Sequence, residues 1–294
     1  MSQAKLLIFG EVLFDCFADG SRVMGGAPFN VAWHCQAFGL NPLLISRIGS
    51  DEMGGEILTA MHQWGMQTSG LQHDAEHSTG MVDVSIEDGS PCYDIVENSA
   101  WDFINQQALP QIDKDSVLYH GSLALRNTVS AQCLAAIKKQ CGGSVFVDVN
   151  LRDPWWQRQH INSVIHGASW LKINDEELDL IVAHENDIES KARFLFTSEK
   201  LKLIIVTKGA AGAIAISDNE MLSVKPETTV NVNDTVGAGD AFCSVMLLGI
   251  DKGWSLKDTL IRAQQFASAV VGLRGATTGD MEFYLPFIKN WALE

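Results

Sequence analysis

The sequence predicts an α/β protein with a mostly parallel central sheet, helices on both faces of that sheet, and a small β-sheet lid. Short β-branched or aliphatic runs alternate with helical patterns along most of the chain, and such alternation produces parallel strands joined by right-handed crossovers. The composition, 46% hydrophobic and 19% charged over 294 residues, is that of a folded globular protein. We therefore expect a single domain over residues 1–294, with a lid from about 12–23 and 79–104.

The order of the elements follows from the apolar runs and the helical patterns between them. The predicted core strands are Leu6–Phe9, Leu43–Ser46, Val117–His120, Val145–Val149, Trp170–Ile173 and Leu203–Thr207. The predicted helices lie near Phe29–Phe38, Gly54–Trp64, Ser130–Lys139, Glu176–Ala183 and Ile188–Phe196. In sheets of this kind ligands bind at the carboxyl ends of the strands, so the loops that follow the strands are where a site is expected.

Two segments carry strand patterns but no crossover helix, namely Val12–Val23 and Thr79–Val96. Apolar and polar residues alternate over residues 82–86, as in a strand with one wet face, and Glu87–Ser90 supplies a hairpin turn. Two interpretations stay open, a lid over the ligand edge of the sheet and a surface hairpin without function. The apolar side of residues 82–86 also suggests a homodimer formed through the lid.

Charge and cysteine content restrict the function. A formal net charge of −15 argues against nucleic acid and anionic membranes as partners, because both attract basic surfaces. The six cysteines form no C-x-x-C pair, which predicts buried free thiols in a reducing compartment. The first apolar stretch is too short for a signal peptide, and no apolar run approaches the roughly 20 residues of a membrane span. We expect a cytoplasmic protein.

The segment Asn231–Phe242 carries the strongest chemical signal, because a polar stretch runs into two glycines, one acid and an apolar helix. A glycine turn at a helix start offers bare N–H groups and partial positive charge to an anion. Asp240 lies within that turn and could act as a base that takes a proton from a hydroxyl. The N–H groups would meanwhile hold the charge that develops on the transferred group. This favours phosphoryl transfer. The alternative is an ordinary helix start capped by Asp234 or Thr235.

Two further motifs lie near the N-terminus. Gly25 and Gly26 precede a predicted helix whose first turn contains Asn30, although Pro28 also marks an ordinary helix start. Asp15 follows the first strand in an apolar stretch, where a carboxylate needs hydrogen-bond donors. Sugar hydroxyls and backbone N–H groups would satisfy it equally well. There is no Walker A motif, and no G-x-G-x-x-G follows the first strand, which disfavours P-loop kinases and Rossmann dehydrogenases.

Four later loops follow predicted strands. Acids in the helix start Asn174–Glu177 either bind a ligand or complement the helix dipole. The segment Thr207–Gly212 is either a ligand loop or a tight turn between strands. Arg126 and Arg152 are candidate contacts for an acidic substrate or for ATP, and Arg152 is equally suited to pair with a nearby acid.

Taken together and in this order, the motifs resemble those of the ribokinase-like carbohydrate kinases, the PfkB family, and most closely its fructokinases. The resemblance spans nearly the whole chain. Asp234–Asp240 matches the C-terminal signature of the family, and Gly25-Gly26 with Asn30 matches the N-terminal one. It implies a ribokinase-like fold, an ATP-dependent kinase, Mg²⁺ and K⁺ as cofactors, and a lid that excludes water.

The resemblance also implies roles for individual residues. Asp240 would be the catalytic base, with Gly237, Ala238 and Gly239 as the anion hole, and Asp15, Gly26 and Asn30 would hold the sugar hydroxyls. The residues expected at the nucleotide and its ions are Asn174, Thr207, Gly209, Gly212 and Ser268 for ATP, Glu177 for Mg²⁺ through water, and Asp234 for K⁺.

The resemblance predicts phosphorylation of a primary hydroxyl on a free sugar, with fructose as the first candidate. Ribose is disfavoured, because Ala27-Pro28 follow the paired glycines and Ser122 stands where ribokinase has a sugar-contacting Glu. The alternatives are a nucleoside kinase or a kinase for another sugar or a sugar acid, all of the same fold, and a non-catalytic sugar-binding protein. The expected partners are a small sugar and ATP.

Overall fold

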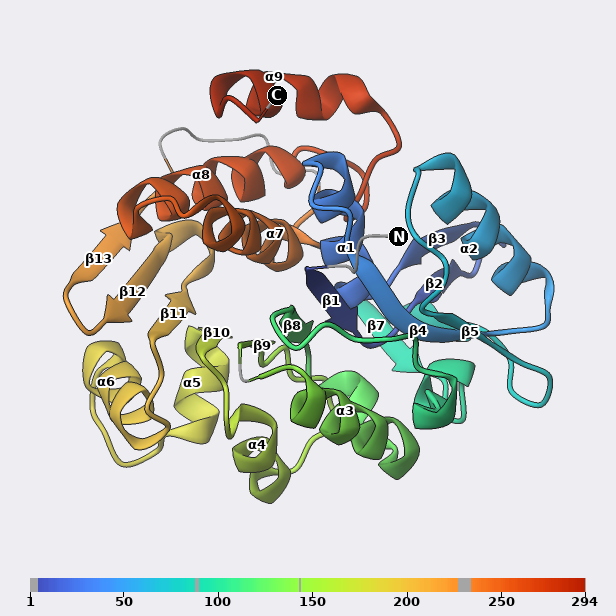
Figure 1. Ribbon diagram of the computed structural model, residues 1–294, viewed down its shortest axis with the longest axis horizontal. Helices are drawn as coiled ribbons and strands as arrows, with labels where there is room; N and C mark the ends of the chain where they lie inside the picture. The colour runs from blue at the N-terminus through green and yellow to red at the C-terminus, as the bar shows by residue number, and fades with distance from the viewer. Residues whose placement is uncertain (1–4, 88–89, 143, 227–233, 294) are drawn as a thin grey trace.

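The fold is known from a computed structural model of the chain, which describes residues 5–87, 90–142, 144–226 and 234–293 (Figure 1). Its centre is a nine-stranded sheet in the order β13-β12-β11-β10-β9-β8-β1-β4-β5. The strands are β1 (Leu6–Phe9), β4 (Leu43–Gly49), β5 (Leu71–Asp74), β8 (Val117–His120), β9 (Val145–Asp148), β10 (Trp170–Asn174), β11 (Leu203–Thr207), β12 (Ala213–Ser217) and β13 (Met221–Val224). From β5 to β11 all neighbours are parallel, and β12 is antiparallel to both of its neighbours. The predicted fold class is confirmed.

Helices cover both faces of this sheet (Figure 1). One layer contains α1 (Ala27–Ala37), α2 (Glu52–Gln63), α7 (Ala238–Lys252), α8 (Leu256–Val270) and α9 (Met281–Asn290). The other layer contains α3 (Thr128–Gln140), α4 (Arg158–Ile165), α5 (Asp175–Ile181) and α6 (Ile188–Ser198). Successive strand residues alternate between the two cores, so that Ile8 packs with the first layer and Leu7 with the second.

Every predicted core strand and helix is present, with ends shifted by at most three residues. The largest difference is in β4, which continues to Gly49 because its last residues pair with β5. Strands β5 and β13 and helices α4, α8 and α9 were not predicted. The segment of α4 is mostly polar. No helix in the described ranges is both long and apolar enough to cross a membrane.

A second, four-stranded sheet has the order β3-β2-β6-β7 and lies beside β1 and β4 (Figure 1). Its strands are β2 (Leu13–Phe17), β3 (Arg22–Gly25), β6 (Gly80–Glu87) and β7 (Ser90–Ile95). Both segments predicted for the lid contribute strands to it. The alternation in β6 is confirmed, since Val82 and Val84 are buried while Asp83 and Ser85 are exposed. The turn predicted between β6 and β7 includes residues 88–89, outside the described ranges.

The buried positions of Val82 and Val84 change one prediction. Both side chains belong to the hydrophobic core of this same chain, so they do not form the free apolar face on which lid-to-lid dimerisation was predicted. The side chain of Ile86 lies outside the described part of the chain.

Beyond the small sheet, the chain forms a short 3₁₀ helix, Ala100–Phe103, rather than another strand. Trp101 is fully buried there. Arg126 lies between the rings of Trp101 and Trp155, at 4.2 and 4.4 Å from the ring centres. Its Nε and Nη2 atoms each donate to Asp102 at 2.7 Å. Arg126 therefore joins the base of the small sheet to the main body, and its charge is already paired.

Candidate active site

The predicted site residues of the two signatures meet where the carboxyl ends of the parallel strands face the first turns of α1 and α7. Gly237 is the N-cap of α7 with φ 80°, a left-handed conformation that favours glycine. A side chain at this position would collide with Ala276. Helix geometry leaves the N–H groups of Gly239 and Asp240 without intrahelical acceptors, and the macrodipole adds partial positive charge. The turn is suited to an anion.

Asp240 is the third residue of α7 and is 8% exposed. Asn30 of α1 donates to its Oδ2 at 2.8 Å. Burial raises the pKa of Asp240 to about 6, the Asn30 hydrogen bond opposes this rise, and Asp148 adds to it. A carboxylate with this pKa is ionised at neutral pH and binds a proton more readily than an ordinary aspartate, as a general base requires.

The start of α1 forms the neighbouring wall of the site. Gly26 is its N-cap with φ 102°, and a Cβ at Gly26 would lie 2.8 Å from the carbonyl oxygen of Glu11. The side chain of Asn30 is 4% exposed, and no donor from the described residues reaches its Oδ1. A buried acceptor without a donor costs free energy, and a ligand hydroxyl would satisfy it.

Asp15 lies on β2, on the face of the small sheet that it shares with Val82 and Val23. Its carboxylate is close to Gly25, where a Cβ would be 3.6 Å from Oδ2. Burial and then the Asp234 carboxylate raise the pKa of Asp15 to about 6, while Arg152 opposes this rise. The small sheet thus brings Asp15 to the same site as the C-terminal signature.

Arg152 is the arginine that faces this site. Its charge acts on Asp15, Glu11 and Asp240, and its Nη1 donates to the adjacent carbonyl of Leu151 at 2.9 Å. Arg152 is exposed and forms no ion pair with any described residue. It therefore remains available to a ligand, unlike Arg126.

Asn174 and Glu177 form a capping box at the start of α5. Asn174 Oδ1 accepts the N–H of Glu177 at 2.7 Å, and Glu177 Oε2 accepts the N–H of Asn174 at 3.0 Å. Glu177 Oε1 accepts the N–H of Leu151 at 2.7 Å. Burial raises the pKa of Glu177. These bonds connect the start of α5 to the loop of Arg152.

Thr207, Gly209 and Gly212 lie in the tight connection between β11 and β12. Lys208 donates its N–H to the carbonyl of Gly212 at 2.7 Å, and a side chain at Gly212 would collide with Val224. Gly212 is thus required by the turn itself, whereas a Cβ at Gly209 would meet no neighbouring atom within the described ranges. Ser268 is half-buried on α8 and accepts from Gln264 at 3.3 Å. No described contact joins these four residues to Asp240.

Asp234 is held immediately before the glycine turn. Its Oδ1 accepts the N–H of Val236 at 2.9 Å, and its Oδ2 accepts the N–H of Gly275 at 3.3 Å. The carboxylate therefore connects the turn to the segment after α8. The residues just before the signature, 231–233, lie outside the described ranges.

Sequence reasoning missed two features of the site. Glu11, two residues after the end of β1, is buried beside the start of α1, and burial raises its pKa to about 7. Lys172 and Asp148 form a buried ion pair beneath α7, with Nζ 2.9 Å from Oδ1. A signal was present for the pair, because a lysine inside the apolar strand Trp170–Asn174 requires a buried partner.

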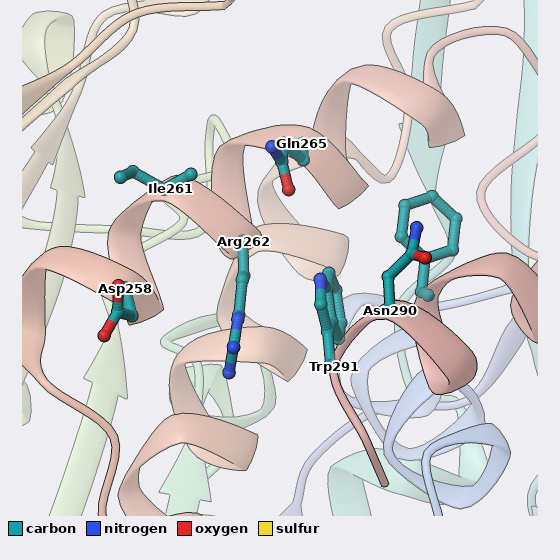
Figure 2. A pocket seen from close by; sticks show the side chains of 7 residues that line it. Asp258, Ile261, Arg262, Gln265, Asn290 and Trp291 are labelled. Atoms are coloured by element: carbon teal, nitrogen blue, oxygen red, sulfur yellow. The ribbon is translucent and has the colours of Figure 1, made fainter.

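A separate hollow of about 490 Å³ lies between α8 and α9 (Figure 2). It is lined by Asp258, Arg262 and Gln265 of α8 and by Asn290 and Trp291 at the end of α9. None of the predicted site residues lines it, so it does not belong to this site.

A buried carboxylate of raised pKa beside an anion-binding helix turn can deprotonate a hydroxyl and hold a charged group that the hydroxyl attacks. This arrangement defines a group-transfer enzyme with a hydroxyl acceptor.

Comparison with known proteins agrees with this class. The sequence matches the pfkB family of carbohydrate kinases over residues 6–282. The chain belongs to this family and is a phosphotransferase that acts on an alcohol group. Among its relatives is the fructokinase of Salmonella typhimurium, 28% identical over 295 residues that cover 94% of this chain and 95% of the relative.

Solved structures share the fold. Fructokinase from Vibrio cholerae, with fructose, ADP and calcium bound, has a TM-score of 0.82 at 25% identity and covers 97% of this chain and 99% of its own. A double mutant of that enzyme binds fructose, ADP and potassium. The aminoimidazole riboside kinase of Salmonella enterica, with its riboside and an ATP analogue, has a TM-score of 0.84 at 22% identity, covering 98% and 99% of the two chains.

Proposed function

We propose that this chain transfers the γ-phosphoryl group of ATP to a primary hydroxyl of a free sugar, with fructose as the first candidate. The observation that carries the proposal is the hydrogen bond between Asn30 and Asp240 at the first turn of α7. It holds a buried base beside N–H groups that have no helical partner.

In this mechanism Asp240 accepts the proton of the sugar hydroxyl as the oxygen attacks the γ-phosphorus of ATP. The bond from phosphorus to the ADP oxygen breaks, and the N–H groups of the Gly237–Gly239 turn stabilise the charge on the transferred group. Asn30, Asp15 and Gly26 would orient the sugar, with Gly26 allowing close approach to the backbone. Alignment of the two reactants contributes to the rate beside the proton transfer.

The nucleotide would lie along the strand ends from β10 to β12, with Asn174, Thr207, Gly209 and Gly212 against it and Ser268 on the adenine side. The support is family membership and the ATP-analogue and ADP complexes of the structural relatives.

Magnesium and potassium would complete the nucleotide side. No group of three or more His, Cys, Asp or Glu side chains within the described ranges could hold a metal ion by itself. Both oxygens of Glu177 already accept backbone N–H groups, so this carboxylate suits Mg²⁺ contacted through water. Bound Mg²⁺ would neutralise phosphate charge. Asp234 is the candidate ligand for K⁺, and a potassium-bound fructokinase is among the relatives.

The small sheet would act as the lid within a single domain over residues 1–294. The segments predicted for the lid, 12–23 and 79–104, carry exposed apolar side chains, including Phe17 and Val23. Val23 is on the same face as Asp15, and closure of that face over a sugar would exclude water from the reaction. The lid-mediated dimer and the cytoplasmic location stay predictions.

A riboside is the second candidate substrate, because an aminoimidazole riboside kinase shares the fold over nearly the whole chain. The absence of a carboxylate at Ser122 supports fructose instead, as does the fructokinase relative.

ADP release with Mg-ATP and K⁺ tests the proposal on fructose, other hexoses, sugar acids, ribose, nucleosides and sugar phosphates. The variant Asp240→Ala measures contaminating activity. Phosphorylation of fructose by the wild type but not by the variant supports the proposal. Phosphorylation of a riboside alone would favour the second candidate substrate. Failure of every free sugar and riboside, with MgATP still bound, contradicts it.

A further inference from the structure

A buried ion pair lies beneath the first turn of α7. Lys172 of β10 and Asp148 of β9 are direct partners in neighbouring parallel strands. Nζ of Lys172 is 2.9 Å from Oδ1 and 3.1 Å from Oδ2 of Asp148. The two residues are only 6% and 1% exposed.

Two further side chains secure the carboxylate of this pair. Tyr119 of β8 donates from its hydroxyl to Asp148 Oδ2 at 3.4 Å, and Cys243 of α7 donates from Sγ to the same oxygen at 3.4 Å. Burying two charges costs free energy that an apolar pair of similar size would avoid. Stability of the fold therefore gives no reason to keep a lysine and an aspartate at these two positions.

The ammonium group lies directly against the anion-binding turn. A Cβ built on Gly239 would be 2.9 Å from Nζ of Lys172 and 3.8 Å from its Cε. The peptide of Gly239 contributes one of the N–H groups that have no intrahelical acceptor. A fixed positive charge beneath this peptide attracts the negative charge that develops on a transferred phosphoryl group.

The pair also acts on the base. Lys172 lowers the pKa of Asp240, and Asp148 raises it more strongly. The other groups that face Asp240 are Asn30 of α1, Glu11 after β1 and Arg152 after β9. The remaining titratable groups around the ion pair are Tyr119, Cys243 and Glu177.

We propose that Lys172, held by Asp148, is a positioning residue for phosphoryl transfer, which fixes the Gly239 peptide and supplies positive charge beneath the anion hole. The inference rests on the proposed kinase function. The negative charge that Lys172 attracts develops as the phosphoryl group is transferred. The ion pair should therefore stabilise the transition state more than it stabilises the bound substrates.

Three variants separate this role from a structural one, namely Lys172→Met, Asp148→Asn and the double variant. Each single variant leaves a buried charge without its partner and should lower Tm, whereas the double variant leaves none and should recover most of that loss. The kcat of the double variant should nevertheless stay about 10- to 100-fold below that of the wild type, with KM for sugar and MgATP changed by less than about threefold.

The pH dependence gives a second readout. In Asp148→Asn the ammonium stays while the carboxylate that raises the pKa of Asp240 is removed, so the acid limb of kcat/KM should move to lower pH. A pair too remote from Asp240 to act on it would leave this limb unmoved. Recovery of both Tm and wild-type kcat by the double variant, or an unmoved acid limb in Asp148→Asn, would overturn the proposal.

The pair of Arg47 and Asp74, 2.8 Å apart at the ends of β4 and β5, is the matched control. Its neutralised variant, Arg47→Met with Asp74→Asn, should keep wild-type kcat and pH dependence. If the wild type phosphorylates no sugar, the proposed function fails independently. The same variants are then compared by slow MgATP hydrolysis, for which the proposal predicts the same order of rates.

Discussion

The floor of the site, made of Asp240, Asn30, Lys172 and Asp148, differs from the lid that carries Asp15. Both Asp240 and Asp15 have a pKa raised to about 6, in each case mainly by burial. Asp240 is fixed by a short hydrogen bond from another helix. No hydrogen bond from another described side chain reaches Asp15, whose neighbours Phe17 and Val23 on the lid are exposed.

The difference indicates a division of labour. Chemistry needs a base held at one position before the substrate arrives, because alignment contributes much of the rate. A lid needs polar groups that gain their hydrogen-bond partners only when the sugar binds. Four predictions test this comparison between the floor and the lid.

The largest effect is expected for Asp240→Asn in the floor. The amide preserves shape and accepts from Asn30 but cannot take the proton, so kcat should fall by about 10²–10⁴-fold. The dissociation constants of sugar and MgATP, measured by calorimetry, should change by less than about threefold. Asp251→Asn at the exposed end of the same helix is the control. Equal losses in binding and kcat would contradict the assignment of Asp240 as the base.

A smaller and different effect is expected for Asp15→Asn in the lid. Hydrogen bonds from sugar hydroxyls to a carboxylate are worth about 1.5–3 kcal/mol, so KM for the sugar should rise by about 10- to 100-fold with little change in kcat. Asp83→Asn, on the opposite face of the same sheet, should leave both constants unchanged. A large fall in kcat with unchanged KM would place Asp15 in the chemistry instead.

The pH dependence of the wild type tests which carboxylate limits the rate. The base must be ionised, so kcat/KM should fall about tenfold per pH unit below about 6. Both carboxyls have a pKa raised to about 6, so the wild-type profile alone does not distinguish them. The limb should persist in Asp15→Asn if Asp240 causes it. Disappearance of the limb in that variant would show that ionisation of Asp15 controls the rate.

The smallest effect concerns stability. The pKa of Asp240 is about 6 in the fold against an ordinary 3.8, so between these values the folded protein binds more protons than the unfolded chain. Its contribution to stability therefore falls as pH rises through this window. Asp240→Asn removes that cost and should raise Tm by about 2–5 °C at pH 7.5, with a smaller gain at pH 4.5. Calorimetry at both pH values measures this, and an unchanged Tm would contradict it.

Local patterns were sufficient to predict six of the nine strands of the main sheet. Strands β1, β8 and β11 begin and end at the predicted residues, because each is an apolar run that continues up to the next loop. The alternation in β6 correctly predicted which side chains are buried. The Asn30–Asp240 contact was not predicted. Family resemblance assigned both residues to one site, and no local pattern relates the two residues.

The contacts that were missed depend on tertiary register. Lys172 meets Asp148 because β9 and β10 pair at those two residues, which neither strand determines alone. For Arg126 the sequence left a contact with an acidic substrate and a contact with ATP open. Its actual partner, Asp102, lies in a segment without a strand pattern, so the ion pair was not predicted. The alternation in β6 did not show what covers its apolar side. Val82 and Val84 pack into the core of this same chain, which depends on where the small sheet lies.

The Asn30–Asp240 hydrogen bond joins residues 210 positions apart, and Gly237 packs against Ala276 still further along the chain. A growing polypeptide on the ribosome would therefore carry an incomplete catalytic centre until nearly all of it had been synthesised. Helix α1 could not be packed until α7, its partner in the same layer, had been synthesised. Contacts between residues so far apart in the sequence slow folding. Nascent chains of this protein should be catalytically silent, and their exposed α1 should be a binding site for chaperones during translation.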